Sequence, residues 1–311
     1  MSFSGEVKEE LAEHISSSRH CQIAELAVIF CYSGRIWKNR EGDTSLSIQS
    51  ENEQVIRKCF TLFKKSFNIC TDVIERGACS LTVRDTEQAR KLLQAFKLLN
   101  ASGEMSQRTD IVNPLLIKNA CCRRAFLRGA FLAVGSMSDP EKSYHLEFVC
   151  GTETQALQLQ ETIRDFAIES RIIVRKNHFV VYMKEGSGIV DLLNVTGAHV
   201  SLMNLENLRI VKEMRNSINR RVNCETANIT KTVNASAKQT EDIILIQKTI
   251  GLKGLQDSLR EAAEVRMEYP DASLKELGQY LNPPVGKSGM NHRLRKLSEI
   301  AEGIRDNKEE K

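Results

Sequence analysis

Leu26-Ala-Val-Ile-Phe-Cys-Tyr-Ser-Gly34 is an apolar stretch that ends in glycine, and Leu127-Arg-Gly-Ala-Phe-Leu-Ala-Val-Gly135 repeats the pattern 101 positions later. Each stretch predicts a buried helix that stops at its glycine. A strand, an amphipathic helix, a hairpin and a closing helix are expected after each. These are residues 45–49, 52–67, 71–84 (around Gly77) and 86–99 in the first copy, and 145–150, 153–169, 171–183 and 187–194 in the second. Such a repeat indicates a duplicated domain with a helix–sheet–helix–hairpin–helix unit in each copy.

The remaining segments flank or join the two copies. We expect an N-terminal helix in 1–18, because Phe3, Val7, Leu11 and Ile15 form an apolar stripe that suits packing against the first repeat. The first repeat covers 19–100, a linker 101–118, the second repeat 119–203, a helical linker 204–254, a helix-turn-helix domain 255–304 and a tail 305–311. Within the helical linker, a helix is expected to end at Arg220-Arg221, before the polar stretch 226–241. The fold class is therefore α+β, followed by an all-α domain.

The composition is that of a soluble globular protein, with 41% hydrophobic residues, 27% charged residues and a net charge of +4. No apolar run reaches the roughly 18 residues of a membrane span, and residues 1–10 lack the features of a signal peptide. We expect a cytoplasmic protein that does not contact a membrane. The nine cysteines are scattered without a C-x-x-C pair, which argues against a disulfide framework and against a zinc site. Neither a metal nor a cofactor is expected.

The two glycine-ended helices resemble the signature helices of the LAGLIDADG homing endonucleases, and the resemblance implies a duplicated αββαββα domain. In that family, the residue before the final glycine is an acid that holds the catalytic divalent metal. Ser33 and Val134 occupy those positions here, and neither supplies the charged oxygen ligand that a hard cation needs. Asp139 follows the second helix, but Ser138-Asp139-Pro140 is a common turn sequence. We therefore expect no catalytic residue, and the protein is not expected to be an enzyme.

The C-terminal region carries a second pattern, two short helices separated by a proline turn. Ser273 and Glu276 predict a capping box at the start of the first helix, which runs to Leu281. Pro283-Pro284 forces a turn, and the second helix begins near Lys287. Its apolar residues at helical spacing are Met290, Leu294, Leu297 and Ala301. This arrangement is typical of a helix-turn-helix, whose second helix enters the major groove of DNA.

The outward face of that second helix has no acid before Glu299. Ser288, Asn291, His292 and Arg295 are the candidates for reading base edges, since Arg suits guanine and Asn suits adenine. Lys287, Arg293 and Lys296 are candidates for phosphate contacts. The alternative is a helical hairpin with a solvated basic face.

Two further basic groups are candidates for additional DNA contacts. Arg35, Lys38 and Arg40 follow the first glycine-ended helix, and Arg215, Arg220 and Arg221 lie in the helical linker that follows the second repeat. A solvated strand edge explains the first group at least as well. A structural linker with a charged exterior explains the second group about as well.

The chain as a whole resembles the WhiA family of transcriptional regulators. The resemblance rests on Arg220-Arg-Val-Asn-Cys-Glu-Thr-Ala-Asn228, Cys122-Arg-Arg-Ala-Phe-Leu-Arg-Gly-Ala-Phe131 and Lys287-Ser-Gly-Met-Asn-His-Arg-Leu-Arg-Lys-Leu297. It implies a degenerate homing-endonuclease domain joined to a helix-turn-helix, and a role in transcription linked to sporulation and cell division. We therefore expect a regulator that binds double-stranded DNA at promoters in the nucleoid without cleaving it. The alternatives are an adaptor that docks another transcription factor or RNA polymerase, and an active homing endonuclease.

Overall fold

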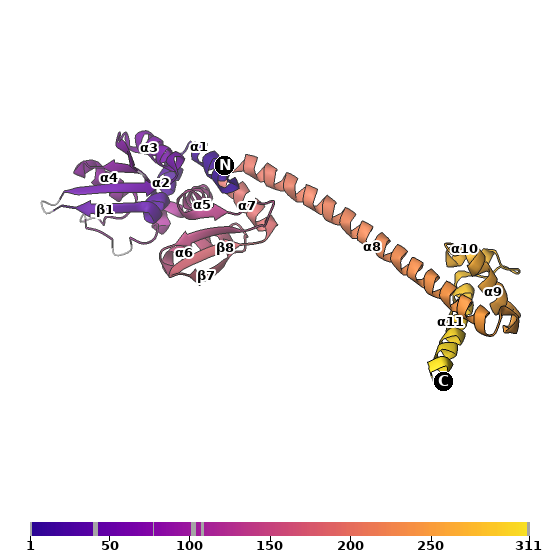
Figure 1. Cartoon of the computed structure of the whole chain (residues 1–311). Coiled ribbons are helices and arrows are strands. Elements are labelled where there is room, and N and C mark those ends of the chain that lie inside the picture. Colours follow the sequence, from indigo (N-terminus) through magenta and orange to yellow (C-terminus); the bar gives the residue numbers. More distant parts are fainter. Residues whose placement is uncertain (1, 40–42, 77, 101–103, 107–108, 310–311) are drawn as a thin grey trace. The chain divides into compact units, whose positions relative to one another are not determined.

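A computed structural model describes residues 2–39, 43–76, 78–100, 104–106 and 109–309 of the chain (Figure 1). Gly77, expected at a hairpin turn, and Arg40, a candidate DNA contact, lie outside the described residues. The chain divides into two compact units, Met1–Lys212 and Glu213–Lys311. Among the described residues, no helix is both long enough and apolar enough to cross a membrane. The seven segments predicted from the sequence, from the N-terminal helix in 1–18 to the tail 305–311, have narrower bounds than these two units and remain a prediction.

The first unit contains the predicted repeat in the predicted order. The first copy consists of α2 (Arg19–Ser33), β1 (Gly34–Lys38), β2 (Thr44–Ser50), α3 (Glu53–Phe67), β3 (Asp72–Arg76), β4 (Ala78–Val83) and α4 (Thr86–Ala95). After the 3₁₀ helix η1 (Pro114–Ile117), the second copy consists of α5 (Ala120–Val134), β5 (Gly135–Met137), β6 (Leu146–Cys150), α6 (Glu153–Arg164), β7 (Arg171–Arg175), β8 (His178–Met183) and α7 (Gly186–Thr196). The duplicated αββαββα domain is confirmed.

Each repeat contains one antiparallel sheet. The strand orders, β1-β2-β4-β3 and β5-β6-β8-β7, are equivalent in the two copies. The registers agree as well, because Gly34 pairs with Ile48 in the first sheet and Gly135 pairs with Phe148 in the second. In both copies the glycine that ends the helix is also the first residue of the first strand, so the chain passes from helix to sheet without a loop.

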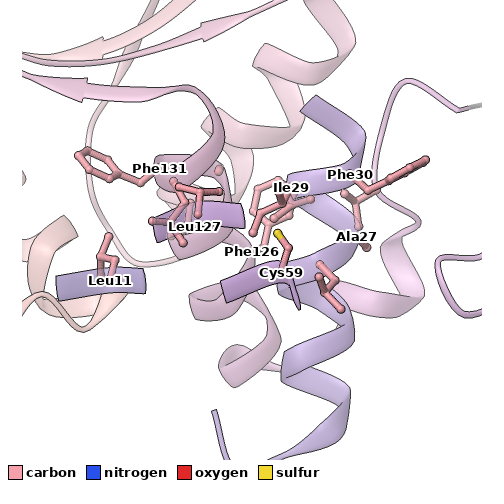
Figure 2. Packing of buried hydrophobic residues seen from close by; sticks show 14 of the residues in the cluster. Leu11, Ala27, Ile29, Phe30, Cys59, Phe126, Leu127 and Phe131 are labelled. Atoms are coloured by element: carbon pink, nitrogen blue, oxygen red, sulfur yellow. The ribbon is translucent and has the colours of Figure 1, made fainter. Parts of the chain in front are cut away.

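Helices α2 and α5 pack against each other at the centre of the first unit (Figure 2). Ile29 of α2 and Phe126 of α5 are both fully buried in a core that spans both repeats. Gly129 permits the close approach, since a Cβ there would lie 2.4 Å from the Cγ1 of Val28. The two repeats therefore form one hydrophobic core rather than two separate ones.

The N-terminal helix α1 (Phe3–Glu13) packs against this core through the predicted apolar stripe. Val7 and Leu11 are fully buried, whereas Phe3 and Ile15 are partly buried. Ser2 caps the helix by accepting a hydrogen bond from the backbone N–H of Gly5. The expected packing of this helix is confirmed.

Helix α8 (His199–Thr249) runs from the first unit into the second without a break. The expected helix end at Arg220-Arg221 is therefore wrong. Between Gly197 and Gly251 the chain contains neither glycine nor proline, so nothing in its backbone chemistry stops the helix. The polar stretch 226–241 is the solvated exterior of a helix.

The second unit has its own core, formed by the end of α8 and the helices that follow. These are η2 (Leu252–Gly254), α9 (Asp257–Glu268), α10 (Leu274–Gln279) and α11 (Lys287–Glu309). Ile243 and Ile246 of α8 are fully buried in this core together with Ala262 of α9 and Met290 of α11. The end of α8 thus belongs to the packing of the C-terminal helices.

Candidate nucleic-acid interface

The capping of α10 sets the start of the candidate interface. The backbone N–H of Glu276 donates to the Oγ of Ser273 (3.4 Å), and the backbone N–H of Ser273 donates to the Oε2 of Glu276 (2.8 Å). These hydrogen bonds hold the pKa of the Glu276 carboxyl below its usual value. The predicted capping box is confirmed.

The turn between α10 and α11 brings the two helices into contact. The backbone N–H of Val285 donates to the carbonyl of Gly278 (2.9 Å). A Cβ on residue 278 would lie 2.2 Å from the carbonyl oxygen of Val285, so only glycine allows this approach. The Asn282-Pro283 peptide bond within the turn is cis.

Helix α11 has a buried side and an exposed side, as the sequence predicts. Met290, Leu294, Leu297 and Ala301 are at most 1% exposed and pack in the core of the second unit. The opposite side presents exposed polar side chains, and a surface groove is lined by Ser288, Asn291, His292, Arg295, Lys296 and Glu299. We call this groove the α11 face. It brings together the four base-reading candidates and one of the phosphate candidates.

Two other candidates on α11 lie outside this face. Arg293 is turned toward α9, where it donates to the carbonyl of Ser258 (3.2 Å) and lies 3.7 Å from the carboxylate of Glu261. Its guanidinium therefore helps to hold α11 on α9. Lys287 is the first residue of α11 and lines a second hollow together with Lys231 and Lys275, among others.

Lys231 and Lys275 were not identified from the sequence. Lys275 is exposed near the start of α10, two residues after the N-cap Ser273, and Lys231 is exposed on α8. Lys275 could have been predicted as a phosphate contact from the sequence. The first helix of a helix-turn-helix crosses the DNA backbone, and Lys275 lies near the start of that helix. Lys231 lines the hollow because α8 continues past Arg221. The sequence predicted that the helix ends there, so it could not indicate Lys231.

The additional basic candidates that the structure describes are exposed, two on a strand of the first unit and three on α8 in the second unit. Arg35 and Lys38 are exposed on β1, which is an edge strand of the first sheet. Arg215, Arg220 and Arg221 are exposed on α8. At about 100° per residue, Arg220 and Arg221 are rotated by about 140° and 240° from Arg215, so the three point in different directions around the helix.

The positions that correspond to the catalytic acids of the nucleases are the last residues of α2 and α5. Ser33 and Val134 are both half-buried there. The Oδ1 of Asp139 accepts a hydrogen bond from the backbone N–H of Glu141 (2.9 Å), which is the expected turn. In the described part of the chain, the side chains that gather as metal ligands lie at the opposite ends of these helices and include none of these three residues.

The architecture and the family comparisons agree. A duplicated, LAGLIDADG-like α+β domain followed by a helix-turn-helix domain defines the class of this protein. Three family models match along the chain: the WhiA N-terminal LAGLIDADG-like domain at 19–99, the WhiA LAGLIDADG-like domain at 123–215 and the WhiA C-terminal HTH domain at 218–301. The chain belongs to the WhiA family.

Individual relatives match over nearly their full lengths. A protein of Lachnoclostridium phytofermentans described as "Probable cell division protein WhiA" is 52% identical over 98% of this chain and 100% of its own. A protein of Thermoanaerobacter pseudethanolicus with the same description is 46% identical over 98% of this chain and 99% of its own. The crystal structure of full-length DUF199/WhiA from Thermatoga maritima superimposes with a TM-score of 0.59 at 26% identity, covering 97% of this chain and 98% of that one.

Proposed function

We propose that this protein is a sequence-specific, DNA-binding transcription regulator that reads base edges with its α11 face and does not cleave DNA. The observation that carries the proposal is the division of α11 between a buried apolar side and an exposed side with Asn291, His292 and Arg295. Two of its relatives are described as probable cell division proteins, which supports a regulator of the sporulation and cell-division type. The sites of action are promoters in the bacterial nucleoid.

The contacts follow from the position of each side chain. Residues in the first turns of a recognition helix contact base edges, and its N-terminus favours phosphate. In our proposal, Arg295 bonds to guanine, Asn291 bonds to adenine, and Ser288 and His292 contact neighbouring edges or phosphates. Lys287 and Lys296 contact phosphates, and so does Lys275 at the start of α10.

The charge along α11 limits the segment that approaches DNA. Glu299 is the first acid on the helix, and its Oε1 lies 3.4 Å from the Nε of Arg295. Both side chains are largely exposed, and such a pair stabilises the protein by at most about 1 kcal/mol. Arg295 can therefore leave Glu299 for a base at little cost. Beyond this point Glu302 adds a second acid. We place the reading segment in residues 287–297.

The absence of nuclease activity is part of the same proposal. A LAGLIDADG-type reaction needs carboxylates at the ends of the two central helices, and Ser33 and Val134 supply none. Incubation of the full chain with plasmid and genomic DNA in the presence of Mg²⁺ tests this. We expect intact DNA, and reproducible cleavage that EDTA abolishes would contradict the proposal.

DNA recognition is tested by mapping bound sites across the genome and measuring affinity for a preferred site by fluorescence anisotropy. Arg295→Ala is expected to weaken binding by about 1–3 kcal/mol and to relax base preference at one position. Lys253→Ala removes an equal charge from an exposed residue of η2 that does not line the α11 face, and it should leave the preference unchanged. Unchanged affinity and preference in Arg295→Ala would exclude the α11 face as the reading surface. If the C-terminal unit binds no DNA at low salt, the adaptor alternative is favoured.

A further inference from the structure

Four side chains with metal-binding atoms meet at the N-terminal ends of α2 and α5. His20 and Cys21 lie in the first turn of α2, and Cys121 and Cys122 lie in the first turn of α5. One imidazole nitrogen and three sulfur atoms all lie within 4.8 Å of one another. The Nδ1 of His20 is 3.1 Å from the Sγ of Cys122 and 3.4 Å from the Sγ of Cys21.

The two halves of this cluster are equivalent positions of the repeat. Cys21 and Cys122 each stand 13 positions before the glycine that ends their helix, and His20 and Cys121 each stand 14 positions before it. Each repeat thus contributes an adjacent pair, and the packing of α2 on α5 brings the pairs together. A missing C-x-x-C spacing excludes only a zinc site whose ligands are close in sequence, whereas these two pairs are 101 positions apart.

The donor set and its spacing suit Zn²⁺. Three thiolates and one imidazole form a common tetrahedral zinc site, with Zn–S distances of about 2.3 Å and Zn–N distances of about 2.0 Å. Such a tetrahedron has edges of roughly 3.5–3.8 Å. Small side-chain rotations are therefore enough to place all four atoms around one ion. Thiolate and imidazole are poor ligands for Mg²⁺ and Ca²⁺, so the site selects against these hard cations.

The helix ends also favour the charge that zinc binding requires. Neither Ser18 nor Asn119, the N-cap residues of α2 and α5, makes a side-chain capping hydrogen bond. A helix N-terminus stabilises a thiolate. Burial acts in the opposite direction and raises the pKa of the Cys21 and Cys122 thiols, so the ion itself must displace their protons.

Two of the four residues are buried and two are exposed to solvent. Cys21 and Cys122 are 5% and 3% exposed and pack with Ala24 and Ala125, whereas His20 and Cys121 are exposed. An ion can therefore approach from solvent and be held against the buried sulfurs.

We propose that His20, Cys21, Cys121 and Cys122 bind one Zn²⁺ that cross-links the two repeats. Four protein ligands leave no open coordination position, so the ion is structural rather than catalytic. It lies at the opposite ends of α2 and α5 from Ser33 and Val134, and is thus distinct from the catalytic metal of the homing endonucleases. Binding releases the three thiol protons to solvent. The proposal does not depend on DNA binding by the second unit.

The test is the zinc content of the full chain, purified without a polyhistidine tag under reducing conditions and reconstituted with Zn²⁺. We expect one zinc ion per chain by plasma mass spectrometry and a thiolate-to-metal charge-transfer band when Co²⁺ replaces zinc. Chelation of the metal should lower the melting temperature. A reconstituted chain without stoichiometric zinc and without the cobalt band would overturn the proposal.

Variants at the exposed ligands keep the test independent of folding. His20→Ala and Cys121→Ser should lower zinc affinity at least tenfold while far-ultraviolet circular dichroism stays unchanged. Cys70→Ser and Cys224→Ser remove exposed cysteines outside the cluster and should bind zinc as the wild type does. Full retention of zinc by both exposed-ligand variants would also refute the site. A Cys21–Cys122 disulfide in the freshly isolated, zinc-free chain would instead identify a redox pair.

Discussion

Glu25 and Arg128 form an ion pair inside the first unit, with 3.1 Å between the Oε1 of Glu25 and the Nε of Arg128. Glu25 belongs to α2 and Arg128 to α5, so the pair joins the two repeats at their central helix contact. The side chains are 0% and 5% exposed. Lys58 of α3 pairs with the same carboxylate and donates to the carbonyl of Leu11 (2.6 Å). One buried carboxylate thus binds a cation from each repeat.

Glu25→Gln is expected to destabilise the first unit strongly. The substitution keeps the size of the side chain but leaves the buried cations of Lys58 and Arg128 without a counterion. Breaking a buried pair in this way costs about 3–5 kcal/mol. The free energy of unfolding in urea, followed by circular dichroism of the full chain, measures the loss.

Asp165→Asn is the matched control for that substitution. It breaks the pair between Asp165 and Arg123, whose charged atoms are 3.0 Å apart but whose side chains are 47% and 34% exposed. Exposed pairs stabilise proteins by about 0–1 kcal/mol, so a small change is expected. Equal effects of the two substitutions would show that burial does not determine the contribution of Glu25.

Stability of the first unit should fall as the pH drops below the usual pKa of histidine. Desolvation and the nearby cations of Arg128 and Lys58 hold the pKa of His14 below the usual histidine value of 6.5. The unfolded chain therefore takes up this proton at a higher pH than the folded chain does. The contribution is fully present above about pH 6.5 and is lost as the pH falls through the lowered pKa. Melting temperatures from pH 7.5 to 5 measure it.

His14→Gln tests the assignment of that pH dependence. The variant cannot take up the proton, so its melting temperature should decline less over this range than that of the wild type. Carboxylates titrate in both proteins, and the difference between the two curves therefore isolates His14. Parallel curves would assign the pH dependence to other groups.

The sequence predicted those features that depend on local patterns. The stretches that end at Gly34 and Gly135 predicted the repeat because apolar periodicity and helix stops are local properties. Residues 273–297 predicted the capping box and the two sides of α11 for the same reason. The sequence interpretation was wrong about the end of α8 at Arg220-Arg221, because a polar stretch does not stop a helix whereas glycine and proline do.

Features that depend on contacts between distant segments were not predictable in this way. The sequence predicts Arg293 as a phosphate contact but does not reveal its hydrogen bond to Ser258, which lies on another helix 35 positions earlier. The cluster of His20 and Cys122 requires the packing of α2 on α5. A single sequence fixes neither contact, because helical spacing determines the face of a residue but not its neighbour across the core.

Gly278→Ala is expected to destabilise the helix-turn-helix. The added methyl group would lie 2.2 Å from the carbonyl oxygen of Val285, and the backbone would have to move. Overpacking of this kind costs about 1–3 kcal/mol. Hydrogen exchange of the amides in α10 and α11 measures the local loss, and DNA affinity should fall with it.

Gly303→Ala is the matched control within the same unit. A Cβ there meets no atom within 4 Å, and the residue lies inside α11. Alanine is favoured over glycine in a helix by about 0.5–1 kcal/mol, so this variant should be slightly more stable than the wild type. If Gly278→Ala is equally stable, the contact with Val285 does not require glycine.

Lys296→Ala and Arg293→Ala should separate DNA contact from internal packing. Both remove one positive charge from α11, but Lys296 is exposed on the α11 face whereas Arg293 donates to Ser258. Lys296→Ala should weaken binding to all sequences alike and reduce the slope of log affinity against log salt by about 1. Arg293→Ala should lower the stability of the second unit and leave that slope unchanged. Anisotropy titrations at several salt concentrations give both slopes. A reduced slope for Arg293→Ala together with an unchanged slope for Lys296→Ala would mean that DNA approaches α11 from the side of α9.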